Sequence, residues 1–149
     1  LKLSICGIGS ALQDAKDYVV NNRIDDVFFH GNVSGKLLIQ QFRQSDLYIL
    51  PTAHGEGMAT SILEAMAFGL PIISRPVGGI CDFFLEGRMG FLLNTLEPQY
   101  YVDIIDNLIS NPTLVKQISL FNHEYAEKHF LASEVTKILE SNIYDNCMH

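Results

Sequence analysis

Apolar and polar residues follow one another in blocks along this chain, and the blocks predict strands and helices in turn. Short apolar runs that end at Gly, Asn or Pro are typical of buried strands, whereas apolar positions that recur every three or four residues are typical of helices. The predicted strands are residues 1–6, 26–30, 46–50, 71–74 and 90–93. The predicted helices are residues 11–21, 36–44, 60–68 and 80–85, and helical sequence follows from residue 98 with breaks near 111–112 and 130–133.

This order of elements predicts an α/β fold. Strands that alternate with helices and are apolar throughout form a parallel, Rossmann-like sheet with helices on both faces. No repeat, low-complexity stretch or linker interrupts the pattern, so residues 1–149 are interpreted as one domain. Ligands of such sheets bind at the carboxyl ends of the strands. The loops expected there hold most of the glycines, at residues 7–10, 31–34, 51–58 and 74–79.

Composition and charge narrow the possible functions. The chain has a net charge of −7 and no cluster of Lys or Arg, which argues against nucleic acid and against an anionic lipid surface as partners. No apolar run approaches the ~20 residues that span a membrane. The three cysteines and five histidines lack the short spacings of a metal site, and no Asp-x-Asp occurs, so we expect neither a metal nor a cofactor. The cysteine usage fits a cytoplasmic protein with reduced thiols.

Two carboxylates mark the segment that follows the third predicted strand. Glu56 lies in a loop with glycines, and Glu64 lies in the helix of residues 60–68, where residues 62–68 are otherwise apolar. A helix this apolar is expected to be buried over most of its surface, where an unpaired Glu would be costly. On chemistry alone, Glu64 could bind a ligand, pair with an Arg or cap a neighbouring turn, and Glu56 could be an ordinary solvated charge.

The spacing of the two glutamates favours a ligand for both. They are eight residues apart, which corresponds to about 12 Å if every step is helical and is the length scale of a nucleotide sugar. A carboxylate accepts two hydrogen bonds and suits the vicinal hydroxyls of a hexose or a ribose. The helix N-terminus between them has free N–H groups and a dipole that favour a phosphate.

Residues 51–79 resemble the signature of glycosyltransferase family 4, a group of retaining enzymes with the two-domain GT-B fold. The matching residues are Pro51-Thr52, Glu56-Gly57-Met58, the run EAMAFGLPI at 64–72, and Val77-Gly78-Gly79. Further matches are CGIG at 6–9, VFFHGNV at 27–33 and EGRMGFL at 86–92. The resemblance covers nearly the whole chain in the order that the family has.

The resemblance implies a nucleotide-diphosphate sugar as the ligand and assigns roles in its site. Glu56 would be the catalytic residue and contact the hydroxyls of the donor sugar, and Glu64 would hold the ribose diol. The backbone that would approach the sugar and diphosphate is that of Gly57, Met58, Ala59, Thr60 and Ser61. The nucleotide and its base would lie against Gly7, Gly9, Gly31, Asn32 and Val33.

The resemblance also implies a truncated, C-terminal half of a GT-B enzyme. The first strand of that half, with the Gly-Arg and the Lys that grip the diphosphate, would be missing. Its expected place is central, between residues 3–6 and 47–50, and we expect another segment, a neighbouring chain or a rearranged strand pairing to fill it. A chain without these cations is expected to be inactive alone.

The resemblance further implies what the intact enzyme would do. It would be a retaining hexosyltransferase, with a UDP-sugar favoured as donor, in polysaccharide or lipid-linked glycan biosynthesis. The acceptor, a glycan or lipid-linked sugar, would bind the missing N-terminal domain. The parent enzyme would work as a peripheral protein at the inner face of the membrane.

Three other interpretations start from the same residues. A nucleotide-sugar epimerase of the same architecture would use the same nucleotide site, but the Glu56–Glu64 spacing favours a transferase. A non-catalytic module could sense a nucleotide sugar, although a degenerate copy would often have lost one glutamate. A dinucleotide-binding domain built on Gly7-x-Gly9 lacks the third glycine, and His30-Gly31 stands where an acidic residue is required.

Overall fold

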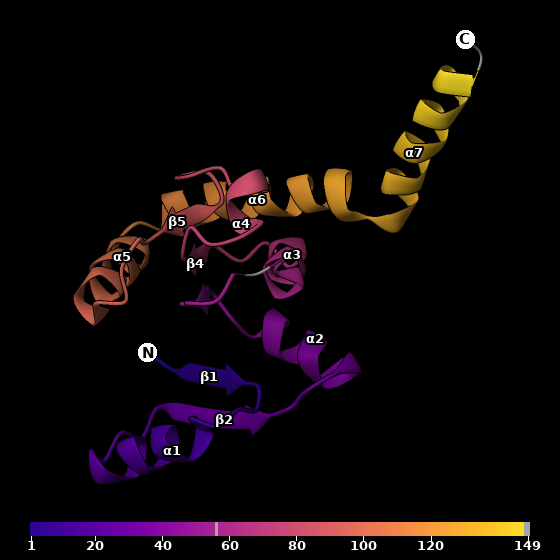
Figure 1. Cartoon of the computed structure of the whole chain (residues 1–149). Coiled ribbons are helices and arrows are strands. Elements are labelled where there is room, and N and C mark those ends of the chain that lie inside the picture. The colour runs from indigo at the N-terminus through magenta and orange to yellow at the C-terminus, as the bar shows by residue number, and fades with distance from the viewer. Residues whose placement is uncertain (56, 148–149) are drawn as a thin grey trace. The chain divides into compact units, whose positions relative to one another are not determined.

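Strands and helices alternate as predicted in the computed structural model of the chain, which describes residues 1–55 and 57–147 (Figure 1). The strands are β1 (Leu3–Cys6), β2 (Val27–Gly31), β3 (Tyr48–Leu50), β4 (Ile72–Ser74) and β5 (Gly90–Leu92). The helices are α1 (Leu12–Asn21), α2 (Gly35–Arg43), α3 (Thr60–Ala67), α4 (Ile80–Phe83), α5 (Pro98–Ser110), α6 (Pro112–Phe130) and α7 (Ala132–Cys147). The predicted elements are confirmed, and the ends of those up to β5 differ by one or two residues at most.

The strands form two parallel sheets, and the division falls between residues 3–6 and 47–50, where the family resemblance leads us to expect a missing strand. In the first sheet β1 pairs with β2, and in the second the order is β3-β4-β5 with β4 in the centre. The two sheets belong to two compact units, Leu1–Gln44 and Ser45–His149. The α/β class with parallel strands is therefore confirmed, while the sheet is divided.

The first unit holds β1, β2, α1 and α2. Leu3 is in register with Val27, and the pairing continues past the strands, because the Leu3 N–H donates to the Asp26 carbonyl at 2.8 Å and the Gly7 N–H to the Gly31 carbonyl at 2.7 Å. Phe42 is the one buried side chain of this unit. Most residues of β1 and β2 are exposed, although their apolar sequences predict buried strands.

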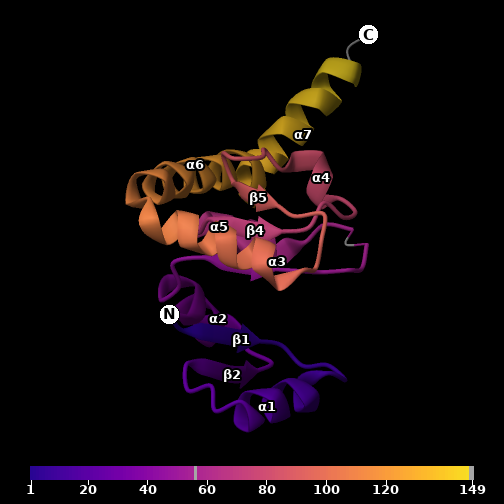
Figure 2. The same ribbon diagram turned by 90° about the vertical axis from the view of Figure 1, so that its left-hand side faces the viewer.

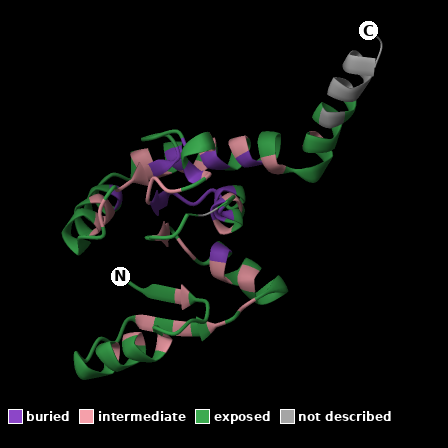
Figure 3. Ribbon diagram, viewed as in Figure 1, coloured by how far each residue is buried: buried purple, intermediate pink, exposed green. Residues whose placement is uncertain are grey.

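The second unit encloses β4 between two layers, and all three residues of β4 are buried (Figure 3). Ile73 packs with Leu108 of α5 and Ile118 of α6 on one face of the sheet. Figure 2 shows α5 in front of the strands of this unit. Side chains alternate along a strand, so Ile72 and Ser74 point to the other face, where α3 contacts β3 and β4.

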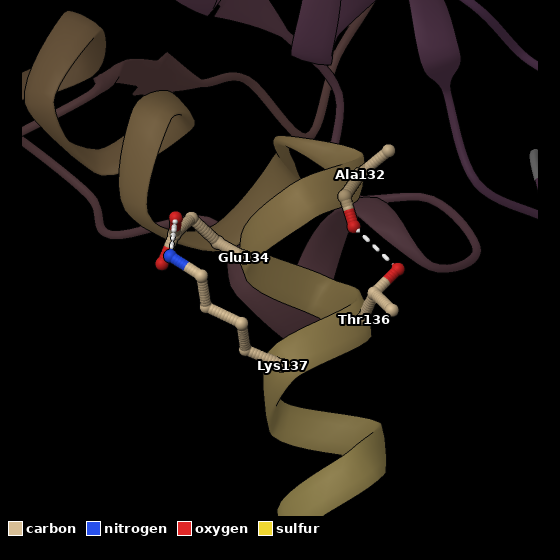
Figure 4. Close-up of polar contacts among 4 residues, drawn as sticks. All are labelled: Ala132, Glu134, Thr136 and Lys137. Carbon is tan, nitrogen blue, oxygen red and sulfur yellow. Dashed lines mark hydrogen bonds and ion pairs between the residues drawn. The ribbon is translucent and has the colours of Figure 1, made fainter.

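The helices after β5 begin where the sequence places helix-start signals. Proline is the first residue of α5 and of α6, where its missing N–H costs nothing. The Asn111 side chain caps α6 by accepting from the Leu114 N–H at 3.1 Å. At the start of α7, Lys137 pairs with Glu134 at 2.7 Å and the Thr136 hydroxyl donates to the Ala132 carbonyl at 2.8 Å (Figure 4). The predicted breaks near 111–112 and 130–133 are thus confirmed.

Helix α6 holds the segments that lead into β4 and β5. Asn122 is fully buried, and its amide donates to the Leu70 carbonyl at 2.8 Å and to the Met89 carbonyl at 2.9 Å. Gly69 ends α3 with φ +74°, the left-handed conformation of a helix C-terminus. These contacts fix where β4 and β5 start, and hence where the loops at their carboxyl ends emerge.

Candidate functional site

The loop from β3 to α3 carries most of the residues predicted to contact a sugar and a diphosphate. Its first turn is closed by Thr52, whose hydroxyl accepts a hydrogen bond from the His54 N–H at 3.2 Å. Gly55, Gly57 and Met58 are exposed. Glu56 lies outside the described residues, so its assignment as the catalytic, sugar-reading residue stays a prediction.

The first turn of α3 offers backbone N–H groups at the end of this loop. Ala59 is the N-cap, is 3% exposed, and forms no side-chain capping bond in the described part of the chain. Its carbonyl accepts from the Ile62 N–H at 2.9 Å and from the Leu63 N–H at 3.4 Å, so the hydrogen bonding of the helix starts at this residue. The N–H groups of an uncapped helix N-terminus, together with the helix dipole, form a site that favours an anion.

Glu64 is exposed, which corrects the expectation that it is buried in an apolar helix. Ile62, Ala65 and Met66 turn inward and are fully buried, while Glu64 lies on the opposite, open face of α3. Its carboxylate has no hydrogen-bond or ion-pair partner among residues 1–55 and 57–147. The alternatives of an Arg partner or a capped turn are therefore not seen in these residues, and the carboxylate is open to a ligand.

Glu64 also shares its face of the helix with the residue that opens it. Thr60 and Glu64 are four residues apart and both exposed, so they lie one above the other at about 6 Å along the axis. Ser61 is half-buried beside them. An anion bound at the first turn would thus lie within one helical turn of the Glu64 carboxylate, which can accept hydrogen bonds from hydroxyl groups of the same ligand.

A second loop, which follows β4, contacts the loop that follows β3. The Ser74 hydroxyl donates to the Leu50 carbonyl at 2.9 Å, and Arg75 Nη1 donates to the Thr52 carbonyl at 3.3 Å. Gly79 lies against the Gly57 carbonyl so closely that a Cβ at residue 79 would collide with that oxygen. Sequence reasoning missed Arg75 and gave Gly79 no role. The available signal was that Arg75 is the one charged residue between Glu64 and Asp82.

Arg75 places a positive charge at the carboxyl ends of the strands. Its side chain is half-buried, and its Nε is buried without a hydrogen-bond partner in the part of the chain that the structure describes. Burial raises the pKa of the Tyr101 hydroxyl, and the nearby Arg75 guanidinium opposes that shift. Tyr101 in turn donates to the Thr95 carbonyl, beyond β5, at 3.1 Å.

The predicted nucleotide-contacting residues of the first unit lie at the carboxyl ends of β1 and β2. The Gly7 N–H donates to the Gly31 carbonyl, so these two loops are joined. Both glycines have positive φ, +137° and +66°, and a Cβ at Gly7, Gly9 or Gly31 would meet no atom within 4 Å. Asn32 is exposed and Val33 half-buried. The structure thus gathers the predicted site residues into two groups, one in each unit.

The described residues hold no group of three or more His, Cys, Asp or Glu side chains that could bind a metal ion. No helix formed by these residues is both long enough and apolar enough to cross a membrane. Cys6 and Cys81 are free thiols on the surface.

Solved structures with the same fold are glycosyltransferases and related enzymes. HepE of Anabaena, crystallised with UDP-glucose, superposes with a TM-score of 0.83 at 19% identity over 97% of this chain and 41% of its own. Sucrose-phosphate synthase of Thermosynechococcus elongatus gives a TM-score of 0.80 at 19% identity over 99% of this chain and 38% of its own. At these identities the likeness establishes the fold, the GT-B glycosyltransferase type.

Sequence relatives lead to the same group of proteins. An uncharacterized glycosyltransferase of Methanocaldococcus jannaschii is 31% identical over 114 residues, 76% of this chain and 29% of its own length. Spore coat protein SA of Bacillus subtilis is 28% identical over 123 residues, 79% of this chain and 33% of its own length. The chain therefore spans a third or less of these relatives. The family model of the group 1 glycosyl transferases matches residues 1–128, and the chain belongs to that family.

Proposed function

We propose that this chain is the donor-binding part of a retaining glycosyltransferase of family 4, which transfers a hexose from a UDP-sugar to an acceptor hydroxyl. The observation that carries the proposal is the uncapped N-terminus of α3 with the exposed Glu64 one turn further on. That pair suits a diphosphate joined to a ribose. Similar folds support the choice of donor, since HepE was crystallised with UDP-glucose and the pneumococcal O-GlcNAc transferase GtfA with UDP and GlcNAc.

The helix N-terminus has the main electrostatic role in this proposal. The diphosphate lies over the backbone from Gly57 to Ser61, with the N–H groups of the first turn directed at its oxygens. Negative charge builds up on this leaving group as the sugar–phosphate bond breaks, and fixed dipoles stabilise that charge without reorganising.

The two glutamates hold the two ends of the donor. Glu64 accepts hydrogen bonds from the two ribose hydroxyls, and Glu56 accepts from the hydroxyls of the sugar and orients it for transfer. The base and the rest of the nucleotide contact the loops of Gly7, Gly9, Gly31, Asn32 and Val33, where the absence of side-chain crowding leaves the backbone accessible.

The remaining parts of the enzyme are proposed to lie outside this chain. They are the acceptor site, for a glycan or a lipid-linked sugar in polysaccharide or lipid-linked glycan biosynthesis, and further cations for the diphosphate. The share of each relative that the chain covers supports this division. This chain alone is accordingly expected to bind the donor weakly and to be inactive. Free surface thiols fit a cytoplasmic enzyme at the inner face of the membrane.

A strand from outside this chain is proposed to pair with β1. Strand β1 pairs with β2 alone among the described strands, and three of its four residues are exposed. Unpaired edge N–H and C=O groups accept a further strand readily. Hydrogen exchange tests this: the β1 amides should exchange more slowly in the intact protein than in this chain. Equal rates would contradict the proposal.

Calorimetry with the intact protein tests the donor assignment. UDP-sugars should bind, and GDP- and ADP-sugars more weakly. Glu64→Ala should weaken UDP and UDP-sugar alike by about tenfold or more, because it removes hydrogen bonds to a charged group. Glu124→Ala, a change of an exposed glutamate on α6, is the matched control. Unchanged UDP binding by Glu64→Ala, or formation of an epimer from the donor without acceptor, would contradict the assignment.

A further inference from the structure

The segment EGRMGFL at residues 86–92 has no role in the donor site proposed above, although it is part of the family resemblance. It forms a turn and then β5, which pairs with β4 alone among the described strands. An edge strand offers unpaired backbone N–H and C=O groups to any further strand, and an apolar edge strand is a site of association. Both residues that follow the glycine of β5 are apolar, so its outer edge needs protection.

The hydrogen bonds between β4 and β5 show which backbone groups of β5 point to the outer edge. The Met89 carbonyl accepts from an N–H of β4 at 3.1 Å, and the Leu93 N–H donates to a carbonyl of β4 at 2.8 Å. In a parallel pair, the groups directed at the partner strand come from every second residue. Residues 89, 91 and 93 therefore face β4, and the N–H and C=O groups of Gly90 and Leu92 face outward.

Two of these outward groups are bonded within the same segment. The Gly90 carbonyl accepts from the Gly87 N–H at 2.9 Å, and the Leu92 N–H donates to Glu86 Oε2 at 3.0 Å. A further parallel strand would use this carbonyl and this N–H together, through the residue that lies opposite Phe91. An antiparallel strand would use both groups of Gly90 or both groups of Leu92, and one of each pair is already bonded.

The turn before β5 places the Glu86 carboxylate at this edge. Gly87 has φ +73°, a left-handed conformation that glycine adopts without strain. The Leu85 carbonyl accepts from the Met89 N–H at 3.0 Å, and the Leu85 N–H donates to the Met89 sulfur at 3.3 Å. The turn is thus closed by its own hydrogen bonds, and Glu86 stands six residues before the N–H that it bonds.

We propose that Glu86 and its turn seal the outer edge of β5 and so prevent a second copy of this chain from pairing with it. A carboxylate bonds a backbone N–H more strongly than the neutral carbonyl of an incoming strand does. Strand β1 has no such seal, since no side chain in the described part of the chain bonds its backbone. The inference does not depend on which ligand the protein binds.

Amide hydrogen exchange in the intact protein tests whether the edge is sealed. The Leu92 amide should be protected in the wild type, and Glu86→Ala should speed its exchange by about tenfold or more, because a bond to a charged group is lost. Glu86→Gln keeps an oxygen that accepts and should retain part of the protection. The matched control is Glu124→Ala, which removes the same charge from an exposed position on α6 and should leave the Leu92 rate unchanged.

Sedimentation velocity over a range of protein concentrations tests what the seal prevents. Glu86→Ala should associate at concentrations at which the wild type and Glu124→Ala keep a constant sedimentation coefficient. The Leu92 amide of the associated variant should regain protection, because pairing through β5 bonds its N–H again. This link between association and one amide identifies the surface that pairs.

Several results would overturn the inference. A Leu92 amide that exchanges freely in the wild type would do so without any variant, as would an unchanged rate in Glu86→Ala. Glu86→Ala that does not associate, or that associates while Leu92 stays unprotected, would show that the bond guards nothing. Equal association of Glu124→Ala would assign the effect to lost charge. Should Glu86→Ala not fold, Glu86→Asp takes its place in both measurements, because it shortens the side chain and keeps the charge.

Discussion

The two units of this chain are built from the same elements and differ in what those elements bury. In Leu1–Gln44, two parallel strands and two helices bury Phe42 alone. In Ser45–His149, the central strand β4 is buried at every position, and helices α3, α5 and α6 contribute fully enclosed side chains (Figure 3). A buried core thus requires a second layer on each face of the sheet, which β1 and β2 lack within their own unit.

The contrast also explains how the candidate site is supported. In the second unit, Arg75 and Gly79 join the loops after β3 and β4, and β4 itself is buried at every position. In the first unit, one backbone hydrogen bond joins the loops of Gly7 and Gly31. Elements of low local stability are often those that order on binding, so the first unit is the one expected to respond to a partner or ligand.

The largest expected effect is a difference in folding between the two units when each is produced without the other. A two-stranded sheet with so little buried apolar surface is not stable alone. We therefore expect a peptide of residues 1–44 to be unfolded by circular dichroism, and residues 45–149 to unfold cooperatively. A cooperative thermal transition of the 1–44 peptide would contradict the comparison.

The next effect concerns one isoleucine from each of the two sheets. Ile73→Ala should lower the free energy of unfolding by about 2–5 kcal/mol, because Ile73 is fully buried against Leu108 and Ile118. Ile5→Ala in β1, where the side chain is half-buried, should cost about 1 kcal/mol or less. Urea denaturation of the two variants measures both, and equal losses would show that the first unit is packed as tightly as the second.

The sequence predicts the elements well because each depends on neighbouring residues. Periodicity placed every strand and helix, and Pro98, Asn111 and Pro112 marked the helix starts. The sequence could not show which face of each helix or strand is covered by the rest of the protein. Residues 62–68 are apolar apart from Glu64, yet Ala67 and Phe68 are exposed, so the apolar run did not show that Glu64 is open.

The local pattern likewise does not show the division into two sheets, which falls where the family resemblance places a missing strand, or the contact of Arg75 with the loop after β3. Two strands pair only when no other segment separates them, and the residue pattern of each strand does not show whether one does. Arg75 meets the Thr52 carbonyl across 23 residues of chain. The partner in a contact of this range is not recorded in the local pattern, which shows only that Arg75 is the one charged residue between Glu64 and Asp82.

A smaller difference in stability is expected between two asparagine variants, because the side-chain amides of both residues donate hydrogen bonds to backbone carbonyls. Asn122→Ala removes the bonds to Leu70 and Met89 in a fully buried position and should cost about 1–3 kcal/mol. Asn22→Ala removes an exposed bond to the Tyr18 carbonyl at the end of α1 and should cost about 0.5 kcal/mol or less. Differential scanning fluorimetry ranks the two, and a reversed order would mean that the first unit depends on surface bonds for its stability.

The smallest effect lies in the reactivity of one thiol in each unit. Partial burial raises the pKa of the Cys6 thiol, and Cys81 is exposed on α4. Only the thiolate is alkylated, so the Cys6 rate should climb with a midpoint above the ordinary pKa of a thiol. With Cys147 replaced by Ser, mass spectrometry follows both sites between pH 7 and pH 10. A Cys6 rate with an ordinary midpoint would mean that β1 opens fully to solvent before it reacts, and the first unit would then be less ordered than its strand pairing indicates.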